Sequence, residues 1–80
     1  MSIARAKIID LLKQKDCQNF GIESNRDVWV SPEGAVIRLP KTGSYIDMDI
    51  VGIVAEQLNM GAWEFDYWLG QIGFNPEQWN

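Results

Sequence analysis

The chain has 80 residues, of which 46% are hydrophobic, and its formal net charge is −4. This length corresponds to one domain, and four tryptophans supply enough apolar area for a buried core, so we expect residues 1–80 to form a single globular domain and not a disordered chain. No apolar run approaches the roughly 18 residues of a membrane span, and the absence of histidine removes the commonest general base and zinc ligand.

A first helix is predicted near the N-terminus. Ser2 is a suitable N-cap, and helix-forming residues follow it to about Asp16. Apolar residues recur at the spacing of one helix face, which predicts the side that packs on the rest of the molecule. That stripe consists of Ala4, Ile8, Leu11 and Leu12.

A short strand and a turn are predicted next. Phe20 and Ile22 alternate with small or polar neighbours, as in a strand, although Gly21 interrupts the pattern. Residues 24–27 are polar and favour a turn.

Residues 28–39 predict a β-hairpin. Residues 32–34, Pro-Glu-Gly, suit the two corners of a type I turn followed by a left-handed glycine. This turn places Ser31 opposite Ala35 and fixes the register of both strands. One face then carries Trp29, Ile37 and Leu39 and is expected to cover the helices; the other carries Val28, Val30, Val36 and Arg38 and is expected to be partly open.

Two further helices are predicted after the loop 40–44. Asp47 is placed to cap the second helix, which 59–61, Asn-Met-Gly, should end. A third helix is expected over about 62–71, and residues 73–80 are expected to form a loosely attached tail. The buried stripes are Ile50, Val51, Val54 and Leu58 in the second helix, and Phe65, Trp68, Leu69 and Ile72 in the third.

The predicted fold is therefore α+β: a helix, a three-stranded antiparallel sheet around the hairpin 28–39, a second helix and a short third helix. This order, together with several sequence segments, resembles the HicA family, small mRNA interferases of bacterial toxin–antitoxin systems with a fold like that of double-stranded-RNA-binding domains. The similar segments are residues 8–13 in the first helix, 29–34 in the hairpin, 36–43 in the return strand and its loop, 50–60 in the second helix and 64–69 in the closing segment.

The resemblance implies a fold and RNA-binding ancestry, but not the family's activity. The family's Gly-Ser-His-His segment falls on residues 24–27, where neither histidine position holds a histidine. A carboxylate such as Asp27 is a poor proton donor at neutral pH. We therefore expect no catalytic residue, and the sequence disfavours an enzymatic function.

Three basic residues form a candidate phosphate-binding patch: Arg26, Arg38 and Lys41. The alternative is that they are solvated charges at strand edges, where they prevent aggregation. All seven lysines and arginines lie within the first 41 residues, whereas residues 42–80 carry six acids and no base. The negative net charge disfavours RNA as a partner.

The four tryptophans are more aromatic mass than one small core requires. Trp68 has the register of a buried residue, whereas Trp63 and Trp79 do not. Exposed tryptophan is enriched at binding interfaces, so Trp63 and Trp79, with Trp29 of the hairpin, are candidate binding residues. The alternative for Trp79 is that it folds back over the third helix.

The acidic pairs and the single cysteine are not expected to form a metal site or a catalytic site. Asp47 and Asp49, like Glu64 and Asp66, are two apart on a helix and point in different directions, so neither pair should bind a metal. Cys17 lacks a neighbouring histidine and is expected to be a small buried hydrophobe. We predict no metal and no cofactor.

The sequence predicts a cytoplasmic protein. Arg5 and Lys7 stand where a signal peptide would carry its apolar segment, and a single cysteine fits a reducing compartment. We expect a non-catalytic interaction protein that binds a protein partner through exposed aromatic and acidic surface, with no membrane partner and with a homodimer left open. The alternative is a HicA-like RNA-binding protein or toxin with an altered site.

Overall fold

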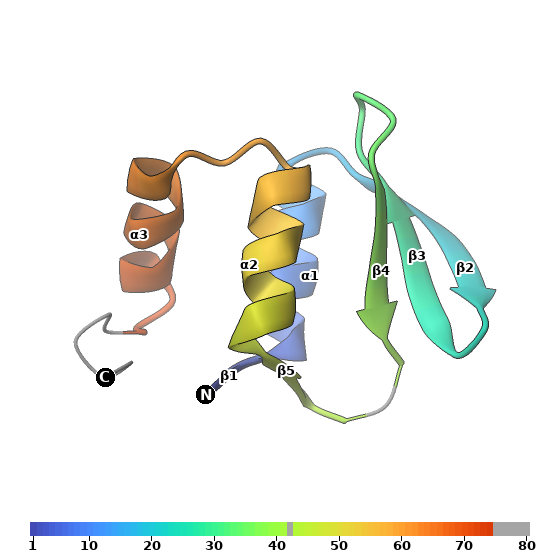
Figure 1. Ribbon diagram of the computed structural model, residues 1–80, viewed down its shortest axis with the longest axis horizontal. Helices are drawn as coiled ribbons and strands as arrows, with labels where there is room; N and C mark the ends of the chain where they lie inside the picture. Colours follow the sequence, from blue (N-terminus) through green and yellow to red (C-terminus); the bar gives the residue numbers. More distant parts are fainter. Residues whose placement is uncertain (42, 75–80) are drawn as a thin grey trace.

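The computed structural model of the chain describes residues 1–41 and 43–74 (Figure 1). The described part contains helices and two antiparallel sheets, which confirms the predicted α+β class. In chain order the elements are β1 (Ser2–Ala4), α1 (Arg5–Gln14), β2 (Gln18–Glu23), β3 (Arg26–Val30), β4 (Val36–Pro40), β5 (Tyr45–Asp47), α2 (Met48–Gln57) and α3 (Ala62–Gln71).

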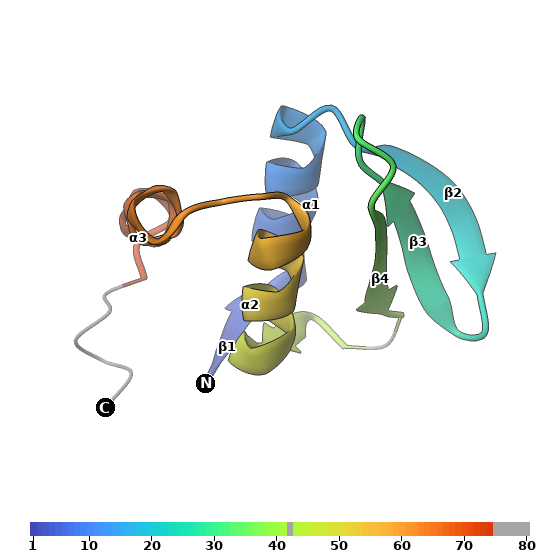
Figure 2. The same cartoon turned by 45° about the horizontal axis from the view of Figure 1, so that its top comes forward.

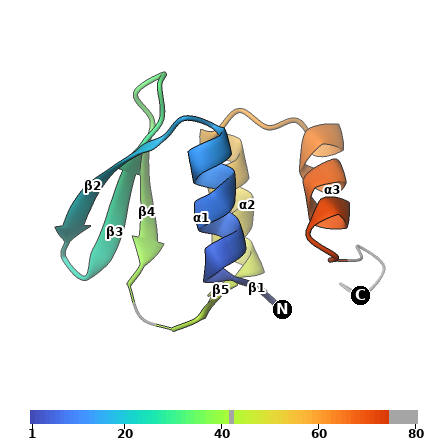
Figure 3. The same cartoon turned by 180° about the vertical axis from the view of Figure 1, so that it is seen from behind.

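The molecule is arranged in three layers (Figures 1 and 3). The β2-β3-β4 sheet forms one side, α1 and α2 lie in the middle, and α3 lies on the side of these helices that faces away from the sheet. In Figure 2 α3 is seen nearly end-on while α1 and α2 are seen from the side, so α3 is inclined to them. The sheet and α3 therefore form opposite ends of the molecule.

The β3–β4 hairpin has the predicted register and turn. The Gly34 N–H donates to the Ser31 carbonyl at 2.9 Å, and the Ser31 N–H donates to the Ala35 carbonyl at 2.9 Å. Gly34 has a φ of +92°, which a residue with a side chain adopts only with strain. Trp29 pairs with Ile37, and Val28 pairs with Arg38.

The two faces of the hairpin differ as expected, with one exception. Trp29, Ile37 and Leu39 are buried against the helices. On the outer face Val36 and Arg38 are exposed, but Val28 is buried as well. Val28 lies in the central strand, with a neighbouring strand on each side, so the sheet itself shields it.

The predicted strand around Phe20 and Ile22 is β2, which pairs with β3 at the edge of the sheet. The pairing shifts between Asn19 and Ile22, and Gly21 within this bulge has a φ of +91°. The glycine that interrupts the strand pattern is thus the residue that allows the bulge. Every residue of β2 is exposed.

The N-terminus differs from the prediction. Ser2 is not a helix cap, because Ser2–Ala4 forms strand β1, which pairs with β5, and α1 begins only at Arg5. The pairing buries Ile3 directly opposite Ile46, which a helical turn at this position would not do. The helix also ends at Gln14, before the left-handed Asp16 at a φ of +59°.

The second and third helices begin where the sequence predicts. Asp47 is the residue before α2, although its side chain makes no capping hydrogen bond. Asn59 at a φ of +58° separates α2 from α3, as the stop signal indicates. α3 spans the predicted residues. The buried stripe predicted for the second helix is partly wrong. Val51, Val54 and Leu58 are buried as predicted, but Ile50 is only half-buried and Ala55 is buried as well.

One hydrophobic core lies between the sheet, the two middle helices and α3. The side chains without measurable exposure are drawn from all of these layers, so the core is continuous through the molecule. They are Ile8 and Leu12 of α1, Ile37 and Leu39 of β4, and Leu69 of α3. Because α3 shares this core, the core fixes which side of α3 faces outward.

Candidate functional site

The outer face of α3 exposes two large aromatic side chains. Trp63 is 91% exposed and Tyr67 is 70% exposed, one helical turn apart. With Ala62 and Asp66 they line a shallow hollow of about 460 Å³. Neighbours at this spacing lie on the same helix face, so one ligand can contact both rings. The expectation that Trp63 is exposed is confirmed.

The inner face of α3 holds the helix in place. Trp68 is buried, as predicted, and Leu69 has no exposed surface. The rings of Phe65 and Trp68 stack with their centroids 6.1 Å apart and an interplanar angle of 23°. Since the packing of α3 uses these residues, Trp63 and Tyr67 are not required to attach the helix to the core.

The charged residues around the aromatic face differ in their partners. Glu64 forms an ion pair with Lys15, the residue that directly follows α1, and this pair joins α3 to the middle layer. Asp66 is exposed and forms no ion pair with any side chain in residues 1–41 and 43–74. The exposed face of α3 therefore carries the Asp66 carboxylate, which has no cationic partner in the part of the chain that the structure describes.

A larger hollow lies beside this face, between α1 and α3. Its volume is about 470 Å³, and Tyr67 and Glu64 border it as well. Lys7 and Asp10 of α1, with Lys15 directly after it, contribute charges of both signs. Mixed charges of this kind favour neither an anion nor a cation.

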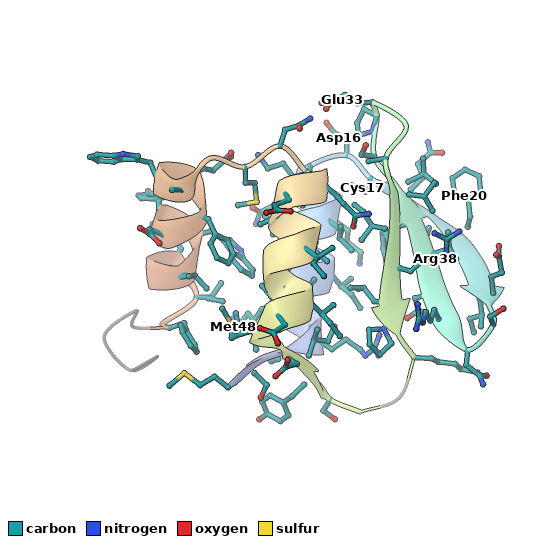
Figure 4. The ribbon with its side chains drawn as sticks, viewed as in Figure 1. Asp16, Cys17, Phe20, Glu33, Arg38 and Met48 are labelled. Atoms are coloured by element: carbon teal, nitrogen blue, oxygen red, sulfur yellow. The ribbon has the colours of Figure 1, made fainter. Side chains whose placement is uncertain are left out.

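The predicted basic patch is assembled only in part. Arg26 and Arg38 are both exposed and line a groove of about 270 Å³ between the sheet and α2. Figure 4 shows Arg38 in the sheet layer, at the end of the molecule opposite α3. Lys41 follows β4 and does not line this groove; its N–H donates to the Asn25 carbonyl at 3.2 Å. Glu23 pairs directly across from Arg26 and reduces the positive charge there.

Asp27 lies on the inner face of the sheet and is paired with Arg5. The Nη1 of Arg5 donates to Asp27 Oδ2 at 3.0 Å, and the Nε of Arg5 donates to the Gly43 carbonyl at 3.1 Å. The two side chains are 16% and 24% exposed. This pair connects the start of α1, the sheet and the loop before β5. Asp27 therefore supports the fold, at a position where the resemblance to the HicA family would place a histidine.

Of the other two candidate tryptophans, Trp29 is buried and Trp79 lies outside the described residues. Trp29 is 7% exposed and packs in the core, so its ring is not available to a partner, which corrects its selection as a binding residue. Its Nε1–H has no hydrogen-bond partner among the described residues. Trp79 and most of the predicted tail lie outside the described residues.

Cys17 is buried and chemically protected. Burial raises the pKa of its thiol, and the carboxylates of Asp16 and Glu33 raise that pKa further because they repel a thiolate. Figure 4 shows these three side chains near the top of α1 and the β3–β4 turn. A raised pKa lowers the thiolate fraction at neutral pH, so Cys17 is not an activated nucleophile.

The structure offers no metal site within the residues it describes. No group of three or more Cys, Asp or Glu side chains comes together there. Asp47 and Asp49, like Glu64 and Asp66, therefore belong to no such group among the described residues. None of the helices in 1–41 and 43–74 is long and apolar enough to cross a membrane.

Comparison with known proteins identifies no relative. No family model matches the chain, and neither the curated proteins nor the solved structures contain a match to it. The function is therefore argued from the residues and their geometry.

Proposed function

We propose that this chain is a non-catalytic binding protein that contacts a protein partner through the outer face of α3. The observation that carries the proposal is the 91% exposure of Trp63. A tryptophan that contributes nothing to the core exposes a large apolar area to water, and such residues dominate the energy of protein interfaces. Tyr67, one turn later, adds a second exposed aromatic ring on the same face.

The surroundings of Trp63 support this function. α3 is fixed to the core by its opposite face, so a partner meets a rigid helix and loses little free energy in ordering it. Within the described residues no group of side chains that could hold a metal ion competes for the assignment. Cys17, the one strong nucleophile, is buried with a raised pKa.

A retention experiment with matched variants tests the proposal. Immobilised wild-type protein is expected to retain one protein from host extract, and the double variant Trp63→Ala/Tyr67→Ala should retain at least about tenfold less, because hot-spot aromatics contribute about 2 kcal/mol or more. Phe20→Ala is the control, since Phe20 is 66% exposed but lies in β2 at the other end of the molecule (Figure 4). Equal retention by wild type and the double variant would rule out α3 as the binding face.

A second candidate function is RNA binding by the groove that contains Arg26 and Arg38. Side chains in this arrangement, on adjacent strands and the same sheet face, can contact successive phosphates. The helix–sheet–helix order agrees with what the resemblance to the HicA family implies. Against it stand the net charge of −4 and the acid opposite Arg26.

Double-stranded RNA separates the two candidates. If the groove binds RNA, Arg38→Ala should weaken binding at low salt and lower the salt dependence by about one phosphate contact. Lys13→Ala removes an exposed positive charge from α1 and should change neither quantity comparably. Negligible binding by wild type and both variants would exclude RNA as the ligand of this groove.

A further inference from the structure

The hollow on α3 combines aromatic rings with a carboxylate. Trp63, Asp66, Tyr67 and Gly70 follow one another at the spacing of a single helix face, and the first three line the hollow. Gly70 has nothing within 4 Å of the position that a Cβ would take, so the face remains open beyond Tyr67. A side chain approaching along α3 can therefore reach both rings and the carboxylate.

The carboxylate decides which kind of side chain fits. An apolar partner that covered the hollow would remove Asp66 from water without supplying a hydrogen bond, and burying an unpaired carboxylate is costly. A cation removes this cost and is also attracted to the faces of Trp63 and Tyr67. Arginine satisfies both demands best, because its planar guanidinium stacks on rings and donates to a carboxylate at the same time.

The charges that α3 itself carries favour the same ligand. Residues 42–80 contain six acids and no base, so α3 lies in the acidic part of the chain. Lys15 is already paired with Glu64 and leaves Asp66 without a partner in the described residues. The positive end of the helix dipole acts mainly within the first turn, whereas Asp66 lies at the start of the second.

We infer that the hollow formed by Trp63, Asp66 and Tyr67 binds an arginine side chain in a basic segment of the partner protein. The inference rests on the proposed function and adds the chemical class of the partner. The guanidinium lies against the aromatic rings and donates hydrogen bonds to the Asp66 carboxylate. Glu64 remains paired with Lys15 and does not compete with Asp66 for the guanidinium.

A peptide titration tests the inference directly. A dye-labelled oligoarginine peptide and a peptide of the same length with citrulline in place of every arginine are titrated with the protein at low salt, with anisotropy as the readout. Citrulline keeps the shape but not the charge. We expect the arginine peptide to bind at least about fivefold more tightly, the ratio that a cation–aromatic contact of about 1 kcal/mol gives.

Variants show whether binding occurs at this hollow. Trp63→Ala and Asp66→Asn should each weaken the arginine peptide by about fivefold or more, whereas Asp49→Asn should change its affinity less than about twofold. Asp49 is an exposed acid in the first turn of α2, so this variant has the same net charge as Asp66→Asn. All of these positions are exposed, and circular dichroism confirms that the variants fold.

Several results would overturn the inference. The first is that the arginine peptide does not bind, and the second is that the citrulline peptide binds equally well. The third is that Asp66→Asn and Asp49→Asn weaken the arginine peptide equally, which would show a general attraction to an acidic protein. A partner whose retention depends on Trp63 and Tyr67 but is not displaced by the arginine peptide would also overturn it, while leaving the proposed function in place. If retention of the partner does not depend on Trp63 and Tyr67, the proposed function itself is ruled out.

Discussion

Asp27→Ala is expected to lower the free energy of unfolding by about 2–3 kcal/mol, because it leaves the Arg5 guanidinium largely buried without its anion. Both side chains of this pair are more than three-quarters buried, and Arg5 Nη2 already has no hydrogen-bond partner in the described residues. The bond from Arg5 to the Gly43 carbonyl would remain, which limits the loss. Urea denaturation measures the change, and a domain of this size should melt about 10 °C lower.

Two variants distinguish the ion pair from a general effect of removing an acid. Asp10→Ala removes an exposed carboxylate from α1 and should cost no more than about 0.5 kcal/mol. The double variant Arg5→Met/Asp27→Leu replaces both charges by apolar groups and should be more stable than Asp27→Ala alone. If Asp27→Ala and Asp10→Ala unfold at the same urea concentration, the pair contributes nothing.

The structural role of Asp27 bears on the resemblance to the HicA family. Asp27 lies on the inner face of β3 and is engaged with Arg5, whereas Arg26 points to the outer face and is exposed. The two residues that fall on the family's histidine positions are thus on opposite faces of the sheet.

Local signals in the sequence predicted the hairpin and α3. The β3–β4 register follows from residues 32–34, whose preferences are set by turn geometry over a few residues. The bounds of α3 follow from a 3.6-residue period with a stop signal before it. Exposure of Trp63 follows from the same period, because it lies off the buried stripe. Tyr67 could have been found by this reasoning, since it is four residues after Trp63.

Contacts between distant residues were not predictable from these patterns. β1 and β5 are three residues each and lie more than forty residues apart in the sequence, so neither shows a period. Ser2 resembles a helix cap locally, and the burial of Ile3 against Ile46 outweighs that preference. Arg5 and Asp27 pair across 22 residues. The arrangement of Arg26, Arg38 and Lys41 likewise depended on which strand edge meets α2.

Leu69→Ala is expected to lower the free energy of unfolding by about 3 kcal/mol, because it removes a side chain with no exposed surface from the core beneath α3. Leu69 is the most deeply buried residue that α3 contributes to the core. The cavity should weaken α3 more than the sheet, since the sheet retains its own buried residues Ile37 and Leu39. Hydrogen exchange should therefore show α3 amides losing protection before those of β3 and β4.

The same variant tests whether partner binding requires a docked α3. Trp63 and Tyr67 remain in Leu69→Ala, but a loosened helix must be ordered on binding, so partner retention should fall without any change to the exposed face. Leu69→Met keeps the volume and should preserve both stability and retention, with a cost below about 1.5 kcal/mol. Ile53→Ala, at a position of α2 that is 56% exposed, is the stability control. If Leu69→Ala costs no more than Ile53→Ala, then Leu69 does not anchor α3 to the core, and the binding face is not held rigid by the packing beneath it.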